Sequence, residues 1–113
     1  MRLKSEIWVK AYLRRTAGLG VSGVVVRRGD PDAGAIYIKV ARLDGTADLY
    51  GPAPAGLVED DGERRWSRVP GLVDEATVDL HLERERKMDT DLWVVEIEDR
   101  NGRAFLDGWL HQP

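Results

Sequence analysis

Two apolar runs separated by a charged loop constrain the fold of this chain more than any other feature. The runs cover residues 21–27 and 35–42 and are rich in valine and isoleucine, and residues 28–34 between them contain two glycines and a proline. Runs of β-branched residues this short are typical of strands, and glycine and proline are typical of the turns between them. The sequence therefore predicts two strands joined by a charged loop.

Length and composition limit the remaining possibilities. The chain has 113 residues and no cysteine, and its 17 basic and 20 acidic residues give a net charge of −3. This length fits a single domain over residues 1–113 that folds on one core without disulfides. The lack of cysteine agrees with a location in the reducing cytoplasm. Because the charge is nearly balanced, no global field attracts phosphate backbones, and nucleic acid is not an expected partner.

Membrane association and export are not expected either. No apolar run approaches the roughly 20 residues that are needed to cross a bilayer. The first residues, Met1–Glu6, lead into a mixed segment rather than into the apolar core of a signal peptide. We therefore expect a cytoplasmic domain without a membrane partner.

Two further segments predict helices. Residues 5–17 fit a helix with Ser5 as its N-cap and with Trp8 and Tyr12 on a buried side, although an alternating strand pattern also fits the beginning of this segment. Residues 72–88 fit a second helix, with acidic side chains near its start and basic side chains near its end, as the helix dipole favours. We expect these helices to cover one or both faces of a sheet.

The other segments predict strands and turns. Asp44-Gly45 is typical of a two-residue hairpin turn, with Gly45 at positive φ, and should join the second strand to an antiparallel third strand. A proline-rich and acidic stretch over residues 51–63 predicts a surface loop. Further strands are expected over residues 46–50, 64–69 and 92–98, with a short return strand at Phe105 and Leu106. Together these elements predict an α+β fold: one compact domain with a mixed, mainly antiparallel sheet of about four to six strands and two helices.

The charged loop Arg27–Gly34 concentrates the side chains that could bind a ligand. The guanidinium groups of Arg27 and Arg28 are suited to a phosphate or a carboxylate, and the first glycine of the loop lets the backbone approach an anion. In an alternative without a ligand, Asp30 and Asp32 cap backbone amides of an ordinary turn and pair with the two arginines. Because adjacent residues of a strand point to opposite faces, we expect one arginine to be structural and the other to be presented to solvent.

Metal binding and catalysis have weaker support in the sequence. Asp30, Asp32 and Asp44 could gather around a hard cation if the hairpin end folded over the loop, but calcium loops need more oxygen ligands at set positions. No glycine-rich phosphate loop, nucleophile elbow or catalytic pair of carboxylates is recognisable. We therefore expect no metal, no cofactor and no catalytic residues.

Four segments of the sequence resemble a known protein family. They are Arg2–Val9, Val26–Gly34, Arg42–Thr46 and Asp91–Arg100. They are similar to the domain of unknown function 1491, a family of small proteins of alphaproteobacteria, and the run Arg27–Gly34 is the most specific part of this resemblance. The resemblance spans nearly the whole chain and implies a bacterial cytosolic protein of one compact domain. It implies no particular activity, cofactor or partner.

Two functional hypotheses follow from these residues. The favoured one is a binding or adaptor domain, monomeric or weakly dimeric, that contacts a protein partner or a small anion through Arg27, Arg28, Asp30, Asp32 and Asp44. The alternative is a small metabolite-binding protein or enzyme, in which the two arginines hold a phosphate or carboxylate and Asp30 or Asp32 acts as a base. A concave pocket that holds both residue types would favour this alternative.

Overall fold

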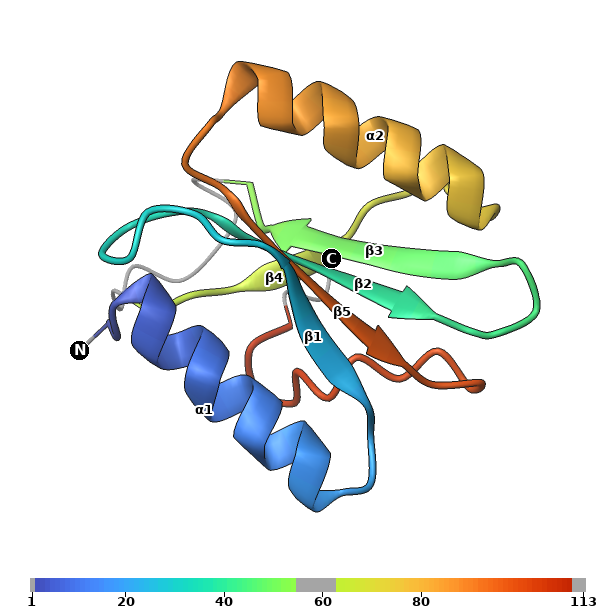
Figure 1. The fold of residues 1–113 in the computed structure, drawn as a ribbon, viewed down its shortest axis with the longest axis horizontal. Coiled ribbons are helices and arrows are strands. Elements are labelled where there is room, and N and C mark those ends of the chain that lie inside the picture. Colours follow the sequence, from blue (N-terminus) through green and yellow to red (C-terminus); the bar gives the residue numbers. More distant parts are fainter. Residues whose placement is uncertain (1, 55–62, 111–113) are drawn as a thin grey trace.

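One helix lies on each face of a central sheet, so that the described residues form three layers (Figure 1). The computed structural model describes residues 2–54 and 63–110. Along the chain its elements are α1 (Ser5–Gly18), β1 (Gly23–Arg27), β2 (Ile36–Ala41), β3 (Ala47–Pro52), β4 (Trp66–Arg68), α2 (Glu75–Met88) and β5 (Trp93–Glu98). The predicted α+β class is confirmed, with two helices and five strands in the described residues. None of the described helices is long and apolar enough to cross a membrane.

The last strand in the sequence lies in the middle of the sheet. The strand order is β1-β5-β2-β3-β4, in which β5 is antiparallel to β1 and parallel to β2. β2 pairs antiparallel with β3, and β3 pairs antiparallel with β4. The sheet is therefore mixed and mainly antiparallel, as predicted. The segment that contains α2 forms part of the crossover between the parallel strands β2 and β5.

The core on one face of the sheet is built around α1. Trp8, Val9 and Tyr12 come from one side of this helix and pack on side chains of β2 and β5. The ring of Trp8 lies 5.0 Å from that of Tyr12 and 4.4 Å from that of Trp66. The helical spacing of these buried residues shows that the strand alternative for residues 5–17 is wrong. The sheet residues of this core are Ile36, Ile38, Val40, Trp66, Trp93, Val95 and Ile97.

α2 covers the opposite face of the sheet. Two buried side chains, Val78 and Leu82, attach it to β3 and β5. The helix begins at Glu75 rather than at residue 72, because the segment before it is bonded to the β2–β3 hairpin. In that segment the carbonyl of Val73 accepts a hydrogen bond from the N–H of Ala47 at 3.0 Å.

Ser5 does not act as the N-cap of α1. It is the first residue of the helix, and the preceding Lys4 makes no side-chain cap. The buried hydroxyl of Ser5 instead donates a hydrogen bond to the carbonyl of Gly34 at 2.6 Å. The prediction was wrong because carbonyls of the charged loop, rather than a side chain, accept hydrogen bonds from the N–H groups of Ser5 and Glu6.

The hairpin between β2 and β3 has a three-residue loop instead of the predicted two-residue turn. The N–H of Arg42 donates to the carbonyl of Thr46 at 3.0 Å, which leaves residues 43–45 in the loop. Gly45 has a φ of 89°, so its predicted positive φ is confirmed, and Leu43 also has a positive φ of 66°. The antiparallel pairing of the two strands is confirmed as well.

The valine run of β1 is not part of the core. The strand begins at Gly23 rather than at residue 21 and lies at an edge of the sheet. Val24 and Val26 are 56% and 57% exposed there. β-branched composition therefore identified the strand but not its place in the sheet, which depends on pairing with distant residues.

Two other predicted segments differ from the structure. Phe105 and Leu106 do not form a return strand, and Leu106 is instead buried in the core on the α1 face. Of the surface loop predicted over residues 51–63, residues 55–62 lie outside the described part of the chain. The strand predicted over residues 64–69 is present as β4, with Trp66 buried as expected.

Candidate anion-binding site

The charged loop between β1 and β2 is folded tightly against the rest of the molecule. Its Asp30 accepts hydrogen bonds from the N–H groups of Asp32 (3.2 Å) and Ala33 (2.9 Å), as an aspartate that closes a turn does. The N–H of Asp30 donates to the carbonyl of Asp91 at 2.9 Å, and its carbonyl accepts from the indole N–H of Trp93 at 2.7 Å. Asp30 therefore stabilises the turn of the loop, as the alternative without a ligand predicts.

The two arginines of the loop have different surroundings. Arg27 is half-buried and donates from Nη2 to the carbonyl of Thr90 at 2.9 Å, and its buried Nε has no hydrogen-bond partner. Arg28 is 60% exposed, forms an ion pair with Glu6, and lies over the ring of Trp93 with its Cζ 5.2 Å from the centroid. These surroundings agree with one structural and one presented arginine. Their partners here are not the aspartates of the loop.

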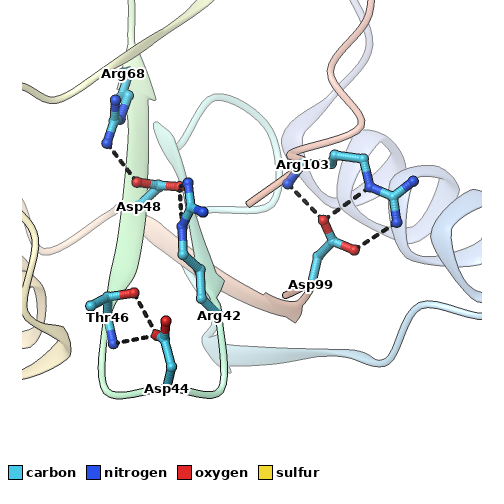
Figure 2. A network of polar contacts seen from close by, with 7 residues as sticks. All are labelled: Arg42, Asp44, Thr46, Asp48, Arg68, Asp99 and Arg103. Atoms are coloured by element: carbon cyan, nitrogen blue, oxygen red, sulfur yellow. Dashed lines mark hydrogen bonds and ion pairs between the residues drawn. The ribbon is translucent and has the colours of Figure 1, made fainter. Parts of the chain in front are cut away.

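The two remaining predicted site residues, Asp32 and Asp44, lie apart. Asp32 is exposed on the loop and forms an ion pair with Lys4 at 3.7 Å. Asp44 lies in the β2–β3 hairpin, beyond the opposite end of β2 (Figures 1 and 2). A shared cation site would need Asp44 to lie close to Asp30 and Asp32. The structure places Asp44 away from the charged loop instead. Among residues 2–54 and 63–110, no group of three or more histidine, cysteine, aspartate or glutamate side chains could hold a metal ion.

The hairpin end carries arginine–carboxylate pairs instead (Figure 2). Buried Asp48 accepts from Nη2 of Arg42 on one oxygen and from Nη2 of Arg68 on the other, both at 2.7 Å. The hydrogen bond to Asp48 raises the pKa of Arg42. Arg103 binds Asp99 at 2.8 Å and lowers the pKa of this carboxyl, although burial opposes the shift. Because these charges satisfy one another, we assign the network to the stability of the hairpin end.

A buried arginine outside the charged loop lies at the same end of the sheet as the loop. Arg64 is 7% exposed, and its Nη2 donates to the carbonyl of Leu3 at 3.1 Å and to the hydroxyl of Ser5 at 2.9 Å. Its Nε is buried and has no hydrogen-bond partner. No carboxylate in the described part of the chain pairs with Arg64. Burial, with a smaller contribution from the positive charge of Arg2, therefore lowers the pKa of Arg64 to about 10.

A cavity of about 360 Å³ lies beside Arg64. Among the described residues, the charged side chains of its lining are Arg2, Arg64, Arg65, Glu63 and Asp89. The cavity also contacts Ala33 of the charged loop, so it lies next to the predicted site without being lined by Arg27 or Arg28. A neighbouring cavity of about 240 Å³ is lined by Arg64 and by Asp32.

A second charged cluster surrounds Lys39 of β2 on the α2 face of the sheet. The side chain of Lys39 is 5% exposed, and its Nζ lies 2.8 Å from carboxylate oxygens of Glu75 and Asp79 and 3.2 Å from that of Glu96. Burial opposes the charged form of Lys39, but these three carboxylates outweigh it and raise the pKa of the lysine. A lysine that is paired in this way is not a base at neutral pH, and the cluster joins α2 to the sheet.

Sequence reasoning missed Arg64 and Lys39 as residues of interest. A signal was present for Lys39, which interrupts the apolar run over residues 36–41 and is the residue type that is buried only when it is paired. Arg64 follows the acidic stretch that ends at Glu63 and is itself followed by Arg65, and such a mixed charged stretch is typical of a solvated face. Its burial depends on the N-terminal segment at Leu3, more than sixty residues away, so no local pattern could reveal it.

The surroundings of Arg27 and Arg28 predict different effects of substitution. We expect Arg27→Met to lower the free energy of unfolding by about 1–2 kcal/mol, because a half-buried side chain loses its hydrogen bond to Thr90. We expect Arg28→Met to change it by less than about 1 kcal/mol, because an exposed ion pair contributes little. Chemical denaturation of both variants measures these effects. Equal losses would contradict the assignment of Arg27 as the structural arginine.

The fold defines a class of small α+β domains, which solved structures share. A crystal structure of a DUF1491 family protein from Caulobacter crescentus CB15 matches with a TM-score of 0.82 and 39% identity, covering 99% of this chain and 100% of that one. An NMR structure of a DUF1491 family protein from the same organism matches with a TM-score of 0.80 and 42% identity, covering 99% of each chain. The solution structure of protein Atu0922 from A. tumefaciens matches with a TM-score of 0.74 and 43% identity, covering 87% of this chain and 86% of that one.

The family model of a protein of unknown function, DUF1491, matches residues 3–107. The chain therefore belongs to the DUF1491 family, which confirms the resemblance of its sequence. No curated protein matches the chain. Since the family description assigns no activity, a function has to be argued from the site.

Proposed function

We propose that this domain binds a small anion in the cavity beside Arg64. The observation that carries the proposal is a buried guanidinium group whose Nε is unpaired and which has no carboxylate partner among the described residues. Burying a charge without a counter-ion is costly, and buried arginines are almost always paired. The adjoining cavity has the size of a small ligand pocket and offers space for the missing anion.

Arg64 also has a structural role, which the proposal has to accommodate. It joins the N-terminal segment at Leu3 and Ser5 to the start of β4. Both of these hydrogen bonds come from Nη2, so the structural role does not use the donors of Nε and Nη1. An anion beside the guanidinium group would supply the counter-charge that the protein contacts leave out.

The proposal describes a binding domain of the cytoplasm rather than an enzyme. The enzyme alternative places a phosphate or carboxylate between the arginines of the charged loop and an aspartate that acts as a base. Arg27, Arg28 and Asp30 do not line the Arg64 cavity, so this cavity does not support that alternative. We propose the cytoplasm because the chain carries no cysteine. Contact with a protein partner is the second candidate function, favoured by the exposed guanidinium group of Arg28 over Trp93.

NMR titration of the ¹⁵N-labelled protein tests the proposal. Sodium acetate and sodium phosphate are added at constant ionic strength, with sodium chloride as the reference. We expect the backbone N–H signals of Ala33 and Ala53 and the indole signal of Trp66 to shift in a saturable way, because these residues line the cavity. The absence of saturable shifts up to about 10 mM of either anion, where a site with a Kd of 1 mM is mostly filled, would overturn the proposal.

Two variants make the test specific to Arg64. Arg64→Met should abolish the saturable shifts, whereas Arg68→Met, which removes an arginine outside the cavity, should leave them unchanged. Arg64→Lys provides a folded comparison if Arg64→Met does not fold. It keeps the positive charge but loses the planar donor fork, so binding should weaken without being lost.

A further inference from the structure

We infer that two copies of this chain associate through β1, by antiparallel pairing of one β1 strand with the other about a two-fold axis at Val24. This inference is independent of the proposed function, because no residue of β1 lines the Arg64 cavity. Three observations carry it, namely the free backbone groups of the strand, its exposed valines, and the covered state of the opposite edge of the sheet.

β1 presents backbone hydrogen-bonding groups along its free edge. Among the described strands, only β5 pairs with it. The N–H of Glu98 donates to the carbonyl of Ser22 at 3.0 Å, so these two residues face each other as a hydrogen-bonded pair. Such pairs alternate with non-hydrogen-bonded pairs along an antiparallel ladder. Val24 therefore bonds to β5, and the N–H and C=O groups of Gly23 and Val25 point away from it.

These outward groups match those of a second copy. Gly23 and Val25 are two residues apart, which is the spacing of hydrogen-bonded pairs in an antiparallel ladder. When the axis passes through Val24, Gly23 of each copy faces the partner's Val25, and each of these pairs can exchange both hydrogen bonds. The register of β1 against β5 shifts between Val25 and Arg27, so this pairing uses only the regular part of the strand.

The exposed valines of β1 add apolar contacts to this pairing. Val24 lies opposite Glu96 on the α2 face of the sheet, and Val26 lines a cavity with Leu82 on the same face. On the axis the two Val24 side chains meet directly, in the cross-strand pair that brings side chains closest, and each Val26 is a diagonal neighbour of the partner's Val24. Since Val24 and Val26 are 56% and 57% exposed, their burial favours association.

The charges of β1 do not oppose this pairing. Edge strands of soluble proteins are commonly protected by charged residues or proline, and residues 23–26 contain neither. The charged residue of the strand is Arg27, three positions beyond the axis. The two Arg27 residues would lie six positions, about 20 Å, apart along the pair, which exceeds the screening length of about 8 Å at physiological salt.

The opposite edge of the sheet is covered by the chain itself. The N–H of Trp66 in β4 donates to the carbonyl of Trp109 at 2.8 Å, and Trp66 also forms a parallel bridge with Leu110. Of the two edges of the described sheet, β1 is therefore the open one. A ladder this short buries much less than the roughly 1,600 Å² of a standard interface, so we expect a weak dimer with a Kd on the order of 0.1 mM.

Sedimentation equilibrium and amide hydrogen exchange of the full chain test the inference. Between about 0.01 and 1 mM protein, the average mass should rise from that of one chain toward that of two. The N–H groups of Gly23 and Val25 should exchange about threefold more slowly at 1 mM than at 0.05 mM, the ratio of free monomer fractions for this Kd. The N–H of Val24 should be protected at both concentrations, because it bonds to β5 within each copy.

Three variants locate the interface. Val24→Lys places like charges directly opposite each other and should weaken the dimer at least about tenfold. Leu80→Lys is the matched control, since Leu80 on α2 is 58% exposed, and it should leave the dimer unchanged. Val25→Pro removes an outward N–H without breaking a bond to β5, so it should abolish the dimer in a protein that still folds.

Two kinds of result would overturn the inference. A mass of one chain up to 1 mM would exclude pairing with a second copy and would leave the open edge to a segment of another protein. Association that persists in both β1 variants, or that Leu80→Lys weakens as much as Val24→Lys, would place the interface elsewhere on the molecule.

Discussion

Trp93→Ala should lower the free energy of unfolding by about 3–5 kcal/mol, the range for a large side chain removed from a core. Trp93 is 2% exposed, and its indole N–H donates to the carbonyl of Asp30. The substitution therefore opens a cavity on the α1 face of the sheet and also releases the charged loop from β5. Urea denaturation followed by far-UV circular dichroism measures the loss without relying on the fluorescence of the three other tryptophans.

Trp93→Phe separates the two contributions. It keeps most of the packing but removes the indole donor, so we expect a smaller loss of about 1–2 kcal/mol. A loss below about 1 kcal/mol for Trp93→Ala would contradict the burial of this side chain and its role in anchoring the loop.

The second large effect is expected for Lys39→Met, at about 3 kcal/mol and pH 7. Methionine fills a similar volume, but it leaves the carboxylates of Glu75, Asp79 and Glu96 facing one another without a cation. Removing one partner of a buried ion pair costs about 3–5 kcal/mol, and we expect the low end because these carboxylates keep part of their contact with solvent. Lys10→Met is the matched control, since Lys10 forms an exposed pair with Glu6 and should contribute less than about 1 kcal/mol.

The stabilisation by Lys39 should depend on pH in a defined direction. The pKa of Lys39 is raised in the folded protein because its carboxylate partners outweigh the effect of burial. Its protonation therefore stabilises the fold fully below the unfolded value of about 10.4, and this contribution is lost as the pH rises through the folded pKa. The difference between the natural protein and Lys39→Met should thus stay constant from neutral pH to about pH 10 and then decrease. A difference that grows with rising pH would contradict the proposed pairing.

Hydrophobic periodicity predicted the elements of this fold better than their arrangement. The helices at residues 5–17 and 72–88 and the core strand at residues 92–98 could be predicted because their patterns are local. The parallel pairing of β5 with β2 could not, because it joins residues such as Ile36 and Trp93 that share no local signal. For the same reason the valines of β1 could not be recognised as edge residues.

The residues of the candidate site were also difficult to predict from local sequence patterns. The charged loop that the sequence indicated borders the Arg64 cavity through Ala33. It did not identify Arg64, whose neighbours in sequence indicate a solvated face. Asp44 was grouped with the loop, whereas β2 separates the two in space. Arg64 is unusual because it is buried and no carboxylate among the described residues pairs with it, and this becomes visible only once the chain is folded.

The central position of β5 has a consequence for how the molecule forms during synthesis. Its ladder with β1 joins Gly23 to Ile97, and among the described strands only β5 pairs with β1. At about 5–20 residues per second, an emerging chain therefore carries β1 and its valines unpaired for several seconds. Contacts so distant in sequence also slow folding itself. The exposed valines of β1 are therefore open to contacts with other chains along both edges of the strand until β5 completes the sheet.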